Sequence, residues 1–176
     1  MFDVVPRNRS DLKAAKKRLK AEAWRVLAEL GTQRGLISKY AGHPQEYLYD
    51  FVWLDGGGAL ALVVESETSM YGYDVLYDFG KLLHAKAPIK LILFLDSPLI
   101  ARNGEIRRIS VDMIENALNS YTGHVAGEEY IVVQFCNLRT RCLEAYRWLV
   151  SESQTLTLQS GESCKLVKFF SHSWTP

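Results

Sequence analysis

The chain has 176 residues, with 21 Lys/Arg and 20 Asp/Glu, a formal net charge of +1 and a hydrophobic fraction of 48%. This composition is that of an ordinary globular protein, and the length predicts a single domain, residues 1–176, with a sizeable core. No apolar run reaches the roughly 18–20 residues needed to span a bilayer, so we expect no membrane partner.

Residues 11–30 predict an amphipathic helix. Ser10 is a suitable N-cap residue, and Gly31 is a suitable residue for the position that follows the helix. The apolar stripe of this helix comprises Leu12, Ala15, Leu19, Ala23, Val26, Leu27 and Leu30. The opposite face carries Lys13, Lys16, Lys17, Lys20 and Arg25.

Positive charge is concentrated at this end of the chain. Residues 1–39 hold ten Lys/Arg and four Asp/Glu, a balance of +6, whereas the remainder has a balance of −5. A basic helix of this kind suits contact with the phosphates of a nucleic acid. A solvated helix face explains the same charges equally well.

Residues 47–67 predict a hairpin of two apolar strands joined by a glycine turn, after a short edge strand over 34–40 and a break at 42–44. Both faces of the hairpin are largely apolar, with Tyr49 and Phe51 expected on the same face. Two apolar faces indicate a sheet that is covered on both sides. The predicted fold class is therefore α/β, with a mixed β-sheet and helices on both of its faces.

Three carboxylates are set into this hairpin, namely those of Asp50, Glu65 and Glu67. An acid in a buried strand is unfavourable unless it is paired or bound to a metal ion. Glu65 and Glu67 share a face because they are two residues apart. A four-residue loop over 56–59 would place Asp50 opposite Glu65, and all three carboxylates would then converge. A three-residue loop would place Asp50 opposite Val64 and turn it away from both glutamates.

The next segments alternate between helical and extended patterns. A helix over 72–86 and a strand over 89–95 predict a right-handed crossover with parallel pairing of the two flanking strands. Further along the chain we expect a loop over 96–104, a helix over 111–121, a strand over 129–136, a strand or short helix over 143–150, and strands over 155–158 and 165–170.

The cysteines and the first residues bear on the compartment. Cys136, Cys142 and Cys164 are odd in number and include no C-x-x-C pair, so they indicate neither a disulfide framework nor a zinc site. The first ten residues lack the pattern of a secretory signal. We therefore expect a cytoplasmic protein.

Converging carboxylates are suitable ligands for Mg²⁺ or Mn²⁺, which prefer oxygen donors. Together with the order helix, hairpin with an acid in each strand, helix and strand, they make residues 11–96 resemble the PD-(D/E)XK nuclease superfamily. The resemblance implies a restriction-endonuclease-like α-β-β-β-α-β core, with residues 97–176 as a C-terminal extension of the same fold. Asp50 matches the first acid of the family pattern, and Glu65 matches the second.

The chain departs from the family pattern at one position, because Glu67 stands where a lysine usually stands. Some members of the superfamily carry E-x-E there. Lys81, on the following helix, is then the candidate for a migrated lysine, and Lys39 is a weaker one. Glu22 on the first helix loosely matches an extra acidic ligand of some members. Asp78 would either support the site or simply pair with Lys81.

The resemblance implies a Mg²⁺- or Mn²⁺-dependent phosphodiesterase that acts on nucleic acid, with DNA favoured over RNA. Asp50, Glu65 and Glu67 would hold the metal ion, Lys81 would steady the attacking water or the phosphate, and the basic helix would contact the nucleic acid. A homodimer is compatible with this family. The alternatives are a catalytically inactive binding or assembly module, a structural ion held by the acids, and two glutamates that simply lie in solvent at a strand end.

Overall fold

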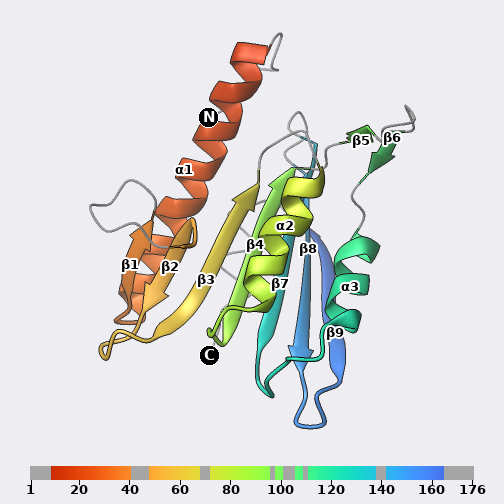
Figure 1. Cartoon of the computed structure of the whole chain (residues 1–176). Helices are drawn as coiled ribbons and strands as arrows, with labels where there is room; N and C mark the ends of the chain where they lie inside the picture. The colour runs from red at the N-terminus through yellow and green to blue at the C-terminus, as the bar shows by residue number, and fades with distance from the viewer. Residues whose placement is uncertain are drawn as a thin grey trace.

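A seven-stranded mixed sheet forms the centre of the structure, in the order β1-β2-β3-β4-β7-β8-β9 (Figure 1). The computed structural model of the chain describes residues 9–40, 48–67, 72–95, 98–100, 106–108, 111–137 and 142–164. The strands of the large sheet are β1 (Ile37–Tyr40), β2 (Phe51–Leu54), β3 (Leu60–Glu67), β4 (Ile89–Leu95), β7 (Glu129–Asn137), β8 (Cys142–Val150) and β9 (Leu156–Cys164). The other elements are α1 (Arg9–Gln33), α2 (Gly72–Leu83), α3 (Val111–Ser120) and the paired short strands β5 (Pro98–Ile100) and β6 (Ile106–Arg108).

The pairing changes from antiparallel to parallel and back across the sheet. β1, β2 and β3 are antiparallel neighbours, β3 pairs in parallel with β4, and β4 pairs in parallel with β7. β7, β8 and β9 are again antiparallel. The predicted α/β class, the mixed sheet and the parallel crossover through α2 are therefore confirmed.

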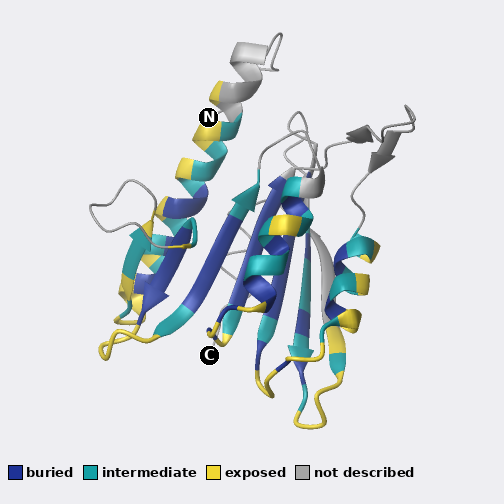
Figure 2. Ribbon diagram, viewed as in Figure 1, coloured by how far each residue is buried: buried dark blue, intermediate teal, exposed yellow. Residues whose placement is uncertain are grey.

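Helices cover both faces of the sheet, and each face has its own buried core (Figures 1 and 2). The α1-side core includes Leu27, Phe51, Trp53, Leu62 and Val64. The core on the other side joins α2 and α3 to the sheet and includes Val52, Val63, Val75, Phe79, Ile92, Ile114 and Leu118. Successive residues of β2 and β3 contribute to opposite cores because side chains alternate along a strand. This explains why both faces of the hairpin are apolar.

α1 continues past its predicted end. Gly31 is buried within the helix and packs against Trp53, whose indole N–H donates a hydrogen bond to the Leu27 carbonyl. A Cβ at position 31 would lie 2.5 Å from Nε1 of Trp53, so there is no room for a larger residue. Gly35, with a φ of 70°, is the residue that takes the left-handed conformation after the helix. The N–H of Leu36 donates to the Gly31 carbonyl and closes the helix end. The prediction that Gly31 follows the helix is therefore wrong.

Several other predicted boundaries shift. α2 ends at Leu83, three residues before the predicted end, and residues 98–100 form strand β5 where a loop was predicted. Residues 143–150 belong to a strand, and residues 155–158 lie at the start of the longer strand β9. The predicted break at 42–44 and the predicted strand over 165–170 lie outside the described residues.

The register of the β2–β3 hairpin depends on two irregularities. The turn is a three-residue loop over 56–58, because the Asp55 N–H donates to the Ala59 carbonyl and Leu54 pairs with Leu60. Trp53, however, pairs with Leu62, so Ala61 is an extra residue that forms a β-bulge. The bulge moves the register by one residue, and Phe51 pairs with Val64. The pairing ends at Phe51 and Val64, and Asp50 lies in the bend that precedes β2, so the strand register does not set its position.

None of the helices in the described part of the chain combines the length and the apolar character needed to cross a membrane.

Candidate active site

Asp50 lies immediately before β2, at the carboxyl end of the neighbouring strand β3. Its Oδ2 atom lies 2.8 Å from Nζ of Lys20 on α1 and accepts a hydrogen bond from the Ser66 N–H at 3.0 Å. Phe51 packs in the α1-side core, but Tyr49 packs against the α2–α3 side. The predicted sharing of one face by Tyr49 and Phe51 is therefore wrong, because the chain bends over residues 48–50 before β2 begins. This bend allows the Asp50 carboxylate to meet Lys20.

Glu65 occupies the buried part of β3 and is only 2% exposed. It shares a face with Val63, two residues earlier, and therefore faces α2. Nζ of Lys81 lies 2.7 Å from Oε1 of Glu65 and 2.8 Å from Oδ1 of Asp78. Asp78 and Lys81 are three residues apart on α2 and therefore lie on the same side of that helix. The structure thus brings together three residues that the sequence singled out.

Burial is the main influence on the Glu65 carboxyl group. Burial raises its pKa to about 7, against an ordinary value of 4.5, although Lys81 lowers it and the charges of Asp78 and Asp50 add to the increase. Asp50 contacts the backbone N–H of Ser66, the residue that follows Glu65. Oε1 of Glu65 receives no well-directed hydrogen bond, so charge attraction dominates its contact with Lys81.

Lys81 and Tyr49 respond to the same cluster. Burial lowers the pKa of Lys81, but the two carboxylates, Asp78 first, outweigh burial and raise it above its ordinary value. Burial raises the pKa of Tyr49, and the charge of Glu65 adds to this effect. Lys81 is therefore a permanent cation between two carboxylates, and the Tyr49 hydroxyl borders the same cluster.

Glu67 lies at the end of β3 and is half-buried. Burial lowers the pKa of Lys16 on α1, and the charge of Glu67 partly opposes this decrease. The acids at this end of β3 therefore face cations from two helices, with Lys16 and Lys20 on α1 and Lys81 on α2. Figure 1 shows that the N-terminal part of α1 extends beyond the carboxyl end of β3.

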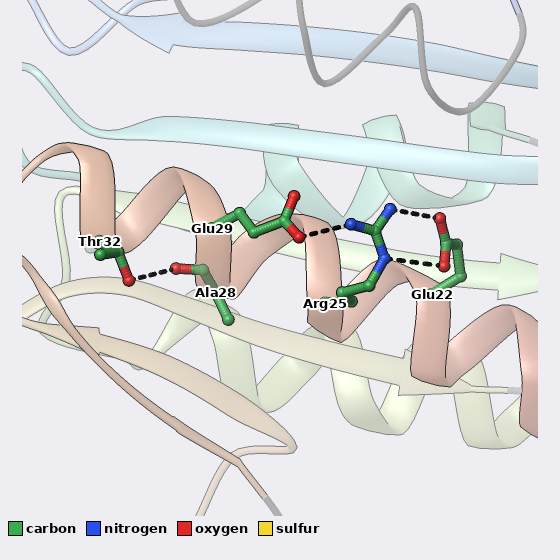
Figure 3. A network of polar contacts seen from close by, with 5 residues as sticks. All are labelled: Glu22, Arg25, Ala28, Glu29 and Thr32. Atoms are coloured by element: carbon green, nitrogen blue, oxygen red, sulfur yellow. Dashed lines mark hydrogen bonds and ion pairs between the residues drawn. The ribbon is translucent and has the colours of Figure 1, made fainter.

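Of the three weaker candidates, Asp78 contacts Lys81, whereas Glu22 lies on α1 and Lys39 on β1. Glu22 is held by Arg25, which also contacts Glu29, in a network along α1 (Figure 3). The hydrogen bond from Arg25 lowers the pKa of Glu22. Lys39 lies on the edge strand β1, opposite Val52. The described hydrogen bonds and ion pairs of Glu22 all lie within α1.

The donor set suits a hard divalent cation, because the available atoms are carboxylate oxygens. Within the described ranges, no three His, Cys, Asp or Glu side chains lie close enough together to form a complete site. Mg²⁺, however, is usually bound by one or two carboxylates, together with water and substrate phosphates. Asp50 and Glu65 fit that smaller requirement, because Asp50 contacts Ser66, the residue after Glu65, and each acid retains an oxygen outside its described contacts.

A second polar cluster lies at the opposite end of the sheet, where β4 and β7 begin. Lys90 is only 1% exposed, and its Nζ donates to Glu128 at 2.6 Å and to the Tyr130 hydroxyl at 3.0 Å. Tyr130 in turn donates to Glu128 and contacts Nδ1 of His124. Burial lowers the pKa of Lys90 and raises that of Tyr130. Sequence reasoning missed this cluster, although Lys90 interrupts the apolar run of residues 89–95.

In comparisons with models of known protein families, with curated proteins and with solved structures, nothing matches this chain. The geometry around Glu65, Asp50 and Lys81 is therefore the basis on which a function can be inferred.

Proposed function

We propose that the chain is a metal-dependent phosphodiesterase that acts on nucleic acid, with DNA favoured over RNA, and that its core is restriction-endonuclease-like. The observation that carries the proposal is the buried carboxylate of Glu65, which is paired with Lys81 and directly precedes Ser66, the residue that contacts Asp50. A buried acid with a perturbed pKa next to a fixed cation is more typical of functional sites than of ordinary cores.

The topology supports the proposed core. The order α1, β1, β2, β3, α2, β4 reproduces the α-β-β-β-α-β succession that the sequence resemblance implies. The first four strands of the sheet also follow one another in space, with β3 and β4 parallel. In such an arrangement the acids on β2 and β3 lie at neighbouring positions.

Each residue has a defined role in this proposal. Asp50 and Glu65 would hold Mg²⁺ or Mn²⁺, and Glu67 would bind directly or through water. The bound metal ion would polarise the phosphodiester and lower the pKa of a bound water. Lys81, which Asp78 and Glu65 keep charged, would stabilise negative charge that develops on the phosphate. The basic face of α1 would contact the backbone phosphates without reading the sequence of bases.

Cleavage assays test this proposal. Purified protein with Mg²⁺ or Mn²⁺ should cut at least one form among duplex DNA, single-stranded DNA and RNA. Asp50→Asn should lower the rate by about a hundredfold or more, because the metal ion supplies several kcal/mol of charge stabilisation. Asp112→Asn, an exposed substitution on α3, is the matched control and should leave the rate unchanged. Absence of cleavage on every substrate, or wild-type cleavage by Asp50→Asn, contradicts the proposal.

The second candidate is a catalytically inactive module with the same fold. The observation that favours it is that Asp50 and Glu65 are both already paired with lysines, while Glu67 stands where the family lysine is expected. Calorimetric titration with Mn²⁺ separates the two functions. Failure to bind Mn²⁺ by correctly folded protein would favour the module, whereas binding that Asp50→Asn abolishes would favour the enzyme.

A further inference from the structure

Lys20 makes the cationic contact of Asp50, and this contact was not evident from the sequence. The Lys20 side chain is 32% exposed, and its Nζ lies 2.8 Å from Oδ2 of Asp50 and 5.5 Å from the centre of the Trp24 ring. The Ser66 N–H donates to the same Oδ2 atom. Both described contacts of the Asp50 carboxylate therefore use one oxygen.

The environment of Lys20 differs from that of Lys81. Lys81 lies between the carboxylates of Glu65 and Asp78, and two anions hold it in place. Lys20 contacts one carboxylate and lies on the α1 side, near Lys16. A lysine ammonium is a point charge on a flexible four-carbon stem, so Lys20 can leave one anion for another at small energetic cost. Lys81 has no comparable freedom.

A divalent cation and an ammonium compete for the same carboxylate. A cation bound to Asp50 places two positive charges close to Nζ of Lys20, and the resulting repulsion favours displacement of the lysine. The nearest new anion would be the phosphate of a nucleic acid strand bound at the same end of the sheet. The side chains of Lys20 and Asp50 are 32% and 23% exposed, and ion pairs that remain open to solvent are weak, so this exchange is energetically accessible.

We propose that Lys20 is a positioning residue that exchanges partners: it holds Asp50 in the free protein, yields that carboxylate to a divalent cation, and then contacts the phosphate of the bound strand. This inference rests on the proposed function, because it assumes that Asp50 is a metal ligand.

The test compares Lys20→Met with Lys17→Met, which removes one exposed charge from the same helix. Calorimetric titration gives the Kd for Mn²⁺. Loss of the competing ammonium should tighten Mn²⁺ binding by Lys20→Met about two- to fivefold, corresponding to an ion pair of about 0.4–1 kcal/mol. Lys17→Met should bind Mn²⁺ as the wild type does. A purely structural Lys20 would not produce tighter binding on removal.

The second readout is the affinity for a fluorescently labelled duplex, measured by anisotropy with and without Mn²⁺. Without Mn²⁺, Lys20→Met should bind the duplex as the wild type does, because Lys20 is then occupied by Asp50. With Mn²⁺, it should bind several-fold more weakly, and Lys20→Arg should restore the affinity. Lys17→Met should lower the affinity for the duplex by the same factor with and without Mn²⁺.

The outcomes separate this inference from the proposed function. Unchanged Mn²⁺ affinity in Lys20→Met, or a loss of duplex affinity that does not depend on Mn²⁺, overturns the role of Lys20 even if the wild type cuts DNA. If the Mn²⁺ and duplex affinities change as expected but the wild type cuts no nucleic acid, the exchange of partners by Lys20 is supported and only the catalytic activity is contradicted. Failure of the wild type to bind Mn²⁺ or the duplex overturns both.

Discussion

Replacing Glu65 by glutamine should make the protein more stable at neutral and alkaline pH. In the folded protein the pKa of Glu65 is about 7, whereas its ordinary value is 4.5. The increase arises from burial, and Lys81 compensates for only part of it. Ionised Glu65 therefore destabilises the fold at pH 8, and an uncharged glutamine of nearly the same shape removes this unfavourable term.

The magnitude and sign follow from linkage. Below pH 4.5 the carboxyl group is protonated in both the folded and unfolded states, and the substitution should have little effect. Between pH 4.5 and about 7 the unfolded chain loses the proton while the folded protein keeps it, so the free energy of unfolding falls as the pH rises. The full difference, from 4.5 to about 7, corresponds to about 3 kcal/mol. Glu65→Gln should therefore be about 3 kcal/mol more stable than the wild type at pH 8.

Urea denaturation, followed by tryptophan fluorescence between pH 4.5 and 8, measures this difference. The variant and the wild type are compared at each pH, so that titration of other groups cancels. Glu152→Gln, in the exposed turn between β8 and β9, is the control and should change the free energy of unfolding by less than about 0.5 kcal/mol throughout. A stability difference that is the same at every pH would show that attraction to Lys81 balances the effect of burial, and a difference that favours the wild type at pH 8 would show that attraction outweighs it.

Three further predictions concern the buried lysine cluster, the helix end and the metal ion. Lys90→Met and Glu128→Gln should each lower the free energy of unfolding, measured in urea, by about 3 kcal/mol. In the double variant the decrease should be smaller than the sum of the two single decreases by at least about 1 kcal/mol. Additive decreases would contradict the pairing of Lys90 with Glu128. Gly31→Ala should lower it by about 1–3 kcal/mol, because the new Cβ meets Trp53; a neutral substitution would place the indole elsewhere. Mn²⁺ at a hundred times its Kd should stabilise the wild type by about 2.7 kcal/mol in thermal melts. An equal stabilisation of Asp50→Asn would show that the ion binds away from the Asp50 carboxylate.

Long apolar runs, and the glycine and proline residues between them, are sufficient to predict most of the fold. β4 begins and ends where the run after Pro88 predicts, because a strand buried on both faces is almost continuously apolar. The end of α1 was wrong because two glycines, Gly31 and Gly35, suit the same role in sequence. The contact that keeps Gly31 inside the helix comes from Trp53, more than twenty residues away.

The candidate site was predictable where the geometry is local. Asp78 and Lys81 share a helix face, and Glu65 is buried in β3 beneath that helix, so their association follows from periodicity and strand order. The partner of Asp50 was not predictable, because several lysines lie on α1 and the way the helix lies on the sheet decides which one meets the carboxylate.

The Lys90 cluster could have been anticipated by the reasoning that singled out Asp50. A charged residue within an apolar strand requires a partner wherever it occurs, and Lys90 lies between Ile89 and Leu91. Its partners could not be named from sequence, because Glu128 is 38 residues away and the two are joined only when β4 and β7 align.

The β-bulge at Ala61 has a genetic consequence. The short turn and the extra residue displace the register in opposite directions, so their effects on the pairing of Phe51 with Val64 cancel. Deletion of Ala61 alone should move Phe51 away from Val64, and insertion of a fourth glycine into the turn over 56–58 should restore the pairing. The two length changes would then behave as mutual suppressors, detectable as loss and recovery of stabilisation by Mn²⁺. The pairing of β2 with β3 thus depends on the turn and the bulge together, and a change in the length of one can be compensated by a change in the other.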